Sequence, residues 1–406
     1  MTVQELKIER ESSRNLFVLW FGVFMVGMGF SAITPFLPLY IKELGHFPTH
    51  LLNLYSSLTF AVTFVMMAII SPIWGRLADK YGRRVMLVRA AAGMAVVVTL
   101  MSFVGNVWEL MALRALQGLF GGYISNATAL IASQTAREKS GRALGILVTG
   151  TTSGQLMGPL IGGVIASFAG YRGSFLLTGG LLFLVFFLTL FAVTETFKPV
   201  QRASQREDKH WFKKLANREF IFGLFVTTAV IQIVNTSINP IIALFVSEIN
   251  QTHISLTILV GLVAAMPGIS TIIAAPRLGK WGDKVGPQYI LMVGFVLAFL
   301  VQFPSAFVTS VFVLMFFRLM IGVSDATMLP QINSLLTKYT PTENISRIFA
   351  YNQSAASIGN VIGPLVGAFV ANLFGYRGVF ISGALFILVN FLHFMTTSRA
   401  LQKSEK

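Results

Sequence analysis

The feature that most constrains this chain is a series of long apolar stretches separated by shorter polar ones. A helix needs roughly 20 apolar residues to cross a hydrocarbon core of about 30 Å. Stretches of that kind lie near residues 16–40, 52–74, 85–104, 108–132, 142–167, 173–195, 219–246, 254–276, 288–308, 311–336, 346–371 and 377–397. The sequence therefore predicts an all-α membrane protein with twelve transmembrane helices.

The chain also repeats itself at an interval of about 204 residues. The matched pairs are Asp79 with Asp283, Arg114 with Arg318, Gly118 with Gly322 and, one residue further apart, Gly154 with Gly359 and Tyr171 with Tyr376. Such matches in one order predict two six-helix bundles related by pseudo-two-fold symmetry. We place the N-terminal bundle at 1–195 and the C-terminal bundle at 219–406, joined by a polar, basic cytoplasmic linker at 196–218.

The basic charge of the chain is best explained by its topology. A net charge of +15 would favour nucleic acid as a partner of a soluble protein, but a 54% share of hydrophobic residues is too high for a soluble surface. Of the 31 Lys and Arg residues, only Lys42, Arg172 and Arg377 fall in one set of alternate loops. Positive residues collect on the cytoplasmic side. We therefore expect both termini in the cytoplasm and no nucleic-acid partner.

The sequence lacks the residues or motifs that several kinds of chemistry require. The chain has no Cys, its five His are scattered without metal-ligand spacing, and no phosphate-binding Gly-x-x-x-x-Gly-Lys-Ser/Thr loop occurs. The segment 322–326, Gly-Val-Ser-Asp-Ala, approaches a nucleophile elbow but lacks the closing Gly. We therefore expect no metal, no cofactor and no enzyme. Two parallel bundles around a central site are instead typical of transporters, driven here by an ion gradient.

The motifs between the spans resemble those of the major facilitator superfamily. The segment 75–84, Gly-Arg-Leu-Ala-Asp-Lys-Tyr-Gly-Arg-Arg, is similar to its loop signature, and 113–118, Leu-Arg-Ala-Leu-Gln-Gly, resembles its fourth-span motif. The glycine-rich segment 150–163 resembles the fifth-span motif of its antiporters. The whole chain is most similar to the twelve-span drug:proton antiporters, including multidrug efflux proteins of the bacterial cytoplasmic membrane.

That resemblance implies a gate at the loop signature. The residues concerned are Gly75, Asp79, Gly82, Arg83, Arg84 and Arg142. Asp79 could pair with Arg83 or Arg142, or cap a helix of the other half and so hold the cytoplasmic side closed. The alternative is that the basic residues only enforce the topology.

The antiporter motif consists of Gly150, Gly154, Gly158, Pro159 and Gly162. Glycine at nearly every fourth position leaves a smooth groove along a helix, where another backbone can approach closely. The groove is either a plain packing surface or, as the resemblance implies, a seal between the halves.

Charged side chains inside the spans are few, because a charge in the membrane interior is costly. Those that lie away from the ends of a span are Arg114, Arg318 and Asp325. Asp325 is the acid placed well inside a span and follows Arg318 by two helical turns. We therefore assign proton coupling to Asp325, Arg318 and Arg114; a structural ion pair is the alternative.

Polar stripes on four spans suggest a substrate cavity. Its candidate residues are Tyr123, Asn126, Gln232, Asn235, Asn239, Gln331, Gln353 and Asn360. Polar groups on one face of a membrane helix face protein or water, so contact between helices is the alternative.

The function expected from these features is proton-coupled multidrug efflux by alternating access. Many cation exporters of the family that the chain resembles keep a carboxylate in the first span, and this chain has none there. We therefore expect amphiphilic drugs that are zwitterionic or neutral, such as fluoroquinolone-like compounds, and dyes, rather than strict cations. The expected partners are small-molecule drugs, protons and membrane lipids, and the chain is expected to act as a monomer. A uniporter or proton-linked transporter of a small metabolite, such as a sugar or an organic acid, would share the fold and remains the alternative.

Overall fold

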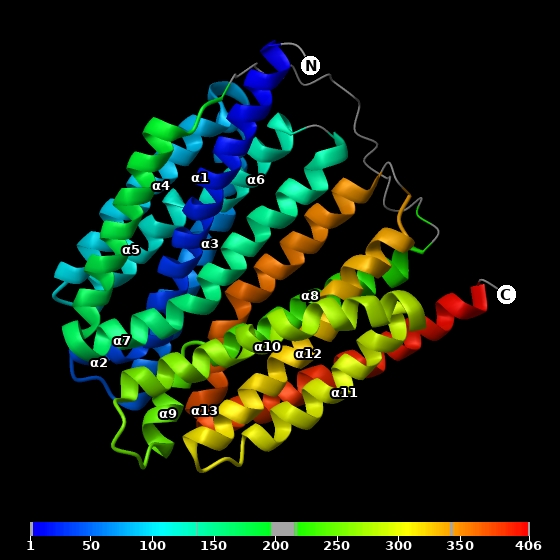
Figure 1. Cartoon of the computed structure of the whole chain (residues 1–406). Helices are drawn as coiled ribbons and strands as arrows, with labels where there is room; N and C mark the ends of the chain where they lie inside the picture. Colours follow the sequence, from blue (N-terminus) through cyan, green and yellow to red (C-terminus); the bar gives the residue numbers. More distant parts are fainter. Residues whose placement is uncertain (1–2, 136, 196–214, 216, 342–343, 405–406) are drawn as a thin grey trace. The chain divides into compact units, whose positions relative to one another are not determined.

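The computed structural model describes residues 3–135, 137–195, 215, 217–341 and 344–404. The described residues form helices and no strands (Figure 1). The helices of the first repeat are α1 (Val3–Ile33), η1 (Thr34–Phe36), α2 (Leu37–Glu43), α3 (Thr49–Tyr81), α4 (Arg83–Leu100), η2 (Met101–Phe103), α5 (Val107–Phe120), α6 (Tyr123–Gln134) and α7 (Arg137–Ala192). Those of the second are α8 (Arg218–Ile238), α9 (Ile242–Ile249), α10 (Leu256–Val285), α11 (Pro287–Ser305), α12 (Val311–Lys338) and α13 (Ile345–Ser404).

Nine helices among the described residues are long and apolar enough to cross a membrane. Two of them, Ala143–Ala192 and Arg347–Ser398, hold 50 and 52 residues. At 1.5 Å per residue each would be about 75 Å long, more than twice a hydrocarbon core. The backbone turns inside each of them at a glycine with positive φ, Gly170 (φ 69°) and Gly375 (φ 71°). Each long element therefore supplies two spans.

The twelfth span is the pair α5 and α6. Its helix is interrupted at Gly121 and Gly122, and Gly122 has a φ of 101° that favours glycine. The pieces of 14 and 12 residues are each too short to cross alone. Among the described residues, seven single helices, the two long elements that each supply two spans, and the α5–α6 pair together make twelve spans, which confirms the expected twelve transmembrane helices.

The contacts divide the chain into two compact units. Unit 1 comprises Met1–His46, Val62–Arg202 and Ile254–Ala265. Unit 2 comprises Phe47–Ala61, Ala203–His253 and Met266–Lys406. Each unit thus holds most of one repeat together with a short segment of the other. Most of the expected linker, 196–218, lies outside the described residues.

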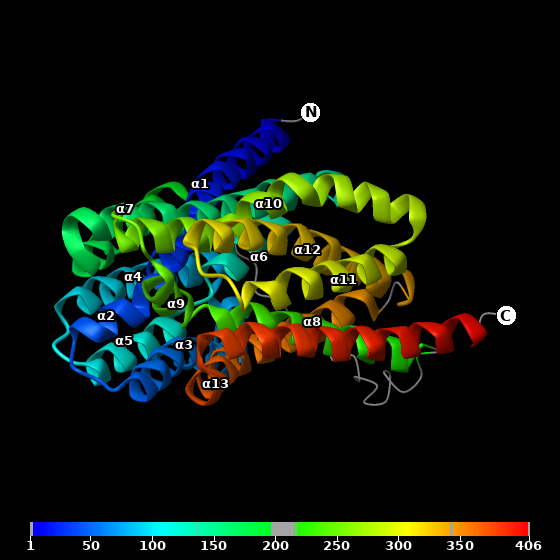
Figure 2. The same ribbon diagram turned by 90° about the horizontal axis from the view of Figure 1, so that it is seen from below.

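The two units are built on one plan. In unit 1, α1 packs along α7; in unit 2, α8 packs along α13. In unit 2, α11 also runs beside α12 (Figures 1 and 2). The glycines of the repeat make equivalent close approaches: a Cβ at Gly118 would collide with the Thr63 carbonyl, and one at Gly322 with the Pro267 carbonyl. The repeat in the sequence is therefore also a repeat in the packing.

Candidate functional site

The interior of unit 2 contains a polar cluster around Asp325. Asn235 Nδ2, from α8, donates a hydrogen bond of 3.1 Å to Asp325 Oδ1, from α12. Both residues line a small cavity of about 10 Å³ whose other lining residues are mostly apolar. The expected acid therefore lies among helices of its own unit, and one of the predicted polar stripe residues is its partner.

The two buried arginines have few polar partners. Arg114 is 2% exposed and donates to Gln117 Oε1 at 3.0 Å, while Arg318 is 8% exposed. Among the described side chains, Arg318 forms no ion pair with Asp325, and Arg318 Nε has no hydrogen-bond partner. Asp325 and Arg318 therefore make no direct ion pair within 4.0 Å in this structure.

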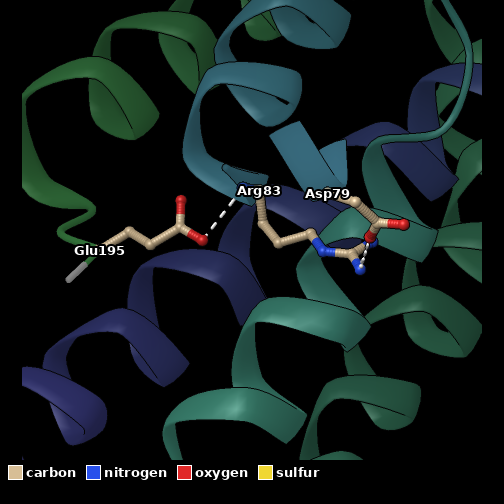
Figure 3. Close-up of polar contacts among 3 residues, drawn as sticks. All are labelled: Asp79, Arg83 and Glu195. Carbon is tan, nitrogen blue, oxygen red and sulfur yellow. Dashed lines mark hydrogen bonds and ion pairs between the residues drawn. The ribbon is translucent and has the colours of Figure 1, made fainter. Parts of the chain in front are cut away.

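The loop between α3 and α4 is held by two carboxylates (Figure 3). Asp79 Oδ1 accepts from Arg83 Nη2 at 3.0 Å, an ion pair within one helical turn of sequence. Of the three expected partners of Asp79, the structure shows Arg83. The side chain of Arg142, another candidate gating residue, lies outside the described residues.

The second carboxylate belongs to Glu195, which the sequence analysis did not assign. Glu195 Oε1 accepts from the backbone N–H of Arg83 at 3.0 Å, and Oε2 accepts from that of Arg84 at 2.7 Å (Figure 3). The first backbone N–H groups of a helix have no partner within the helix, and a negative charge there is favourable. Gly82, the N-cap of α4, supplies no side-chain cap. Glu195 therefore caps α4 from the end of the sixth span.

A network of amides fixes the position of Glu195. The backbone N–H of Thr194 donates to Asn15 Oδ1 at 3.1 Å, and Thr194 O accepts from Asn15 Nδ2 at 2.6 Å and from Gln134 Nε2 at 2.9 Å. Arg84 Nη2 also donates to Leu190 O at 2.7 Å. The loop signature is thus tied to the end of the sixth span, and through Thr194 to α1 and α6.

The glycines of the antiporter motif face α1 of their own unit. A Cβ at Gly150 would lie 2.8 Å from Trp20 O; one at Gly154 would collide with Phe24 O, one at Gly158 with Ser31 Oγ, and one at Gly162 with Ala32 O. The other side of the motif meets α10, because a Cβ at Gly261 would collide with Pro159 O. The motif therefore packs two backbones closely within unit 1.

Three candidate cavity residues are buried and bonded inside their units. Tyr123 OH lies 2.8 Å from Thr189 Oγ1, Asn126 Nδ2 donates to Gly122 O at 2.8 Å, and Gln331 Nε2 donates to Leu278 O at 3.4 Å. The bonds of Tyr123 and Gln331 join two helices, whereas that of Asn126 returns to Gly122, the N-cap of its own helix. Gln353 is exposed, and Gln232, Asn239 and Asn360 are partly exposed, so these four keep surface for other contacts.

Unit 1 also carries an apolar groove of about 370 Å³. Its lining residues are Ser13, Leu16, Phe17, Trp20 and Ile146. The Trp20 ring stacks on Phe24 with centroids 5.7 Å apart, and Trp20 Nε1 donates to Thr149 Oγ1 at 3.1 Å. The groove is wide open to its surroundings, and its lining is mainly apolar and aromatic.

Comparison with known proteins places these features in a family. The model of the Major Facilitator Superfamily matches residues 19–250 and 224–406. The multidrug resistance protein MdtG of Yersinia enterocolitica is 46% identical over 380 residues, which cover 94% of this chain and 92% of that protein. MdtG of Proteus mirabilis is 42% identical over 390 residues, covering 96% and 97%.

Solved structures with the same fold are more distant in sequence. A bacterial homolog of the human lysosomal transporter Spinster, in an inward-facing and occupied conformation, has a TM-score of 0.81 at 15% identity, covering 96% of this chain and 97% of that one. The peptide transporter POT in complex with sulfate has a TM-score of 0.75 at 16% identity, covering 97% and 99%. At sequence identities this low, the structural similarity shows a shared fold.

Proposed function

Because the chain belongs to the major facilitator superfamily, a family of transporters rather than enzymes, we propose that it exports amphiphilic drugs in exchange for protons. The observation that carries this proposal is the 46% identity to a multidrug resistance protein over 94% of the chain. Relatives of that similarity, matched along almost their whole length, commonly share the class of transported compound. The proposal that export is coupled to protons is more specific than this similarity and rests on Asp325.

Asp325 is the proposed proton carrier. It is an acid inside a membrane span with a single amide, Asn235, bonded to one of its oxygens at 3.1 Å. An ionisable residue inside the membrane marks a proton or substrate path by default, because its cost must be repaid by function. Arg318 lies on the same helix and is buried without an ion pair to Asp325 among the described residues. Arg318 and Arg114 would balance the charge as the proton comes and goes.

The apolar groove of unit 1 supports the proposed substrate class. Its wall holds Phe17 and Trp20, and none of its described lining residues is a carboxylate. Aromatic walls with few polar groups bind flat amphiphilic molecules of differing shape. The aromatic, uncharged faces of amphiphilic compounds such as fluoroquinolone-like drugs and dyes therefore suit this surface.

The proposal includes the arrangement in the membrane. The repeats 1–195 and 219–406 act as the two bundles of an alternating-access transporter, with the linker 196–218 and both termini in the cytoplasm. The chain works as a monomer in contact with lipid. The loop signature acts as the gate of the cytoplasmic side, and the antiporter motif acts as the seal between the halves.

The test is transport in proteoliposomes with an imposed pH gradient and norfloxacin as the fluorescent substrate. In the wild type, norfloxacin should move in the direction opposite to that in which protons flow down the imposed gradient. Asp325→Asn should lower net proton-coupled transport by about tenfold or more, equivalent to about 1.4 kcal/mol or more in the barrier. Glu248→Gln, at an exposed carboxylate, is the matched control and should leave the rate unchanged.

The outcomes separate the two parts of the proposal. Unchanged proton-coupled transport in Asp325→Asn would remove Asp325 from the mechanism. Drug movement that ignores reversal of the pH gradient would point to a uniporter and remove proton coupling altogether. Failure to move any of a panel of amphiphilic drugs would exclude the multidrug class.

A further inference from the structure

A second buried amide lines the Asp325 cavity, on a helix that the polar stripes do not include. Gln302, in α11, is 1% exposed and lines the same cavity as Asn235 and Asp325. Within the described part of the chain, Gln302 Nε2 has no hydrogen-bond partner. A buried amide donor without an acceptor is costly, most of all in a membrane protein. This group therefore needs a partner in the cavity.

The fold does not require glutamine at this position. Gly82 and Gly286 are the N-caps of α4 and α11. The offset of 204 residues between them also relates Val98 to Gln302. Val98 is 0% exposed in unit 1. The same place in the other repeat is thus filled by an apolar side chain, which packs without any polar cost. Packing alone therefore does not explain Gln302, and we look for a role in unit 2 that has no counterpart in unit 1.

The cavity has room for one water molecule. Its volume of about 10 Å³ is on the order of the space that a single water needs. A buried water also needs polar partners, typically two to four. Asp325 Oδ1 already accepts from Asn235, which leaves Oδ2 for a donor from the cavity. A water there can form a hydrogen bond with the amide group of Gln302 and donate another to the carboxylate.

We infer that this cavity holds a water bridging Gln302 and Asp325, and that Gln302 is a positioning residue for proton exchange. The inference rests on the proposed role of Asp325 as the proton carrier. Gln302 does not itself change protonation. Its amide fixes the water at the carboxyl oxygen that Asn235 leaves open.

The proton step is a simple relay. The carboxyl O–H bond of Asp325 breaks as an O–H bond forms to the bridging water, and that water passes one of its own protons to solvent. The water is regenerated, the carboxylate carries the negative charge, and one proton has left. Uptake runs the same steps in reverse. Asp325 is only partly buried, so the relay is short.

The first test separates proton exchange from drug movement. Net norfloxacin transport driven by a pH gradient needs Asp325 to release its proton, whereas exchange of labelled for unlabelled norfloxacin at equal pH does not. Gln302→Met, similar in volume but without the amide, should lower net transport by about tenfold, equivalent to about 1.4 kcal/mol, and leave exchange near the wild-type rate. Gln302→Asn, which keeps an amide, should restore much of the net rate.

The matched control is Ser305→Ala, three residues away on α11. Ser305 is 1% exposed, and its hydroxyl donates to Val301 O of its own helix. This variant removes a buried polar group without touching the cavity and should behave as the wild type in both assays. Equal losses of net transport and exchange in Gln302→Met would assign Gln302 a merely structural role and overturn the inference.

A measurement on the wild type keeps the inference testable if a variant does not fold. Infrared difference spectra between protonated and deprotonated protein should show a water O–H band that shifts in heavy-oxygen water and disappears in Asp325→Asn. Absence of that band in the wild type would overturn the bridging water. If Asp325→Asn keeps proton-coupled transport, the proposed role of Asp325 as proton carrier fails, and the present inference fails with it. If Asp325→Asn loses coupling while Gln302→Met keeps it, only the present inference fails.

Discussion

At the scale of single residues, the loop signature depends on a carboxylate outside it. The ion pair of Asp79 with Arg83 is partly exposed, with side-chain exposures of 24% and 31%, and such pairs contribute about 0–1 kcal/mol. Glu195 instead accepts two backbone N–H groups of α4. Because the first turn of a helix has no other partners for these groups, Glu195 is the stronger restraint on where α4 begins.

Replacing Glu195 should therefore weaken the start of α4. Glu195→Leu removes both accepting oxygens, and loss of a helix cap costs about 0.5–2 kcal/mol. We expect a lower unfolding temperature in detergent and faster proteolysis near residues 82–84. Glu195→Gln keeps one oxygen and should lie between Glu195→Leu and the wild type. An unfolding temperature of Glu195→Leu equal to that of the wild type would show that the cap contributes nothing.

At the scale of elements, some glycines of α7 allow it to pack closely against α1 and others do not make such a contact. Gly154 lies against the backbone of Phe24 in α1, and Gly158 lies against Ser31 and the Met28 carbonyl. Gly145, on the same helix, has nothing within 4 Å of a Cβ. The glycine pattern is therefore a contact surface over part of its length and open at its start.

Alanine substitutions along α7 should follow this difference. Gly154→Ala forces a methyl group into the α1 backbone, and overpacking of this kind costs about 1–3 kcal/mol. We expect a reduced yield of folded protein and a lower unfolding temperature. Gly145→Ala should be neutral or slightly stabilising, because alanine favours the helix. Equal effects of the two variants on stability would contradict close packing at Gly154.

At the scale of the whole molecule, the duplicated sequence gives two units that share a packing plan. Each unit turns its longest helix at a positive-φ glycine, Gly170 in one and Gly375 in the other. If Gly170 and Gly375 lie on the outer side of the membrane, and the loop signature and its counterpart around Asp283 lie on the inner side, most of the basic residues fall on the cytoplasmic side.

Single-cysteine labelling checks this topology directly, since the chain contains no Cys. Lys80→Cys and Lys284→Cys should react with a membrane-impermeant maleimide only from the cytoplasmic side. Arg172→Cys and Arg377→Cys should react only from the outer side and serve as controls for each other. Reaction of Lys80→Cys and Lys284→Cys from opposite sides would rule out two parallel repeats.

Much of the fold follows from the sequence, but the site follows only in part. The spans, the repeat and the family motifs are local patterns. Asp325 was also identifiable, because an acid inside an apolar stretch is rare. Its bond to Asn235 was not, since the polar stripe on α8 offered three similar candidates: Gln232, Asn235 and Asn239.

What the sequence by itself determined is the number of helices and their repetition, because lipid forces each crossing segment to be long, apolar and hydrogen-bonded within itself. What only the tertiary structure decided is which polar groups meet. Glu195 reaches Arg83 across 112 residues, and Gln302 shares a cavity with Asp325 from another helix. These contacts between side chains depend on how each helix is rotated about its axis. That rotation is set by the packing of the helix against all of its neighbours.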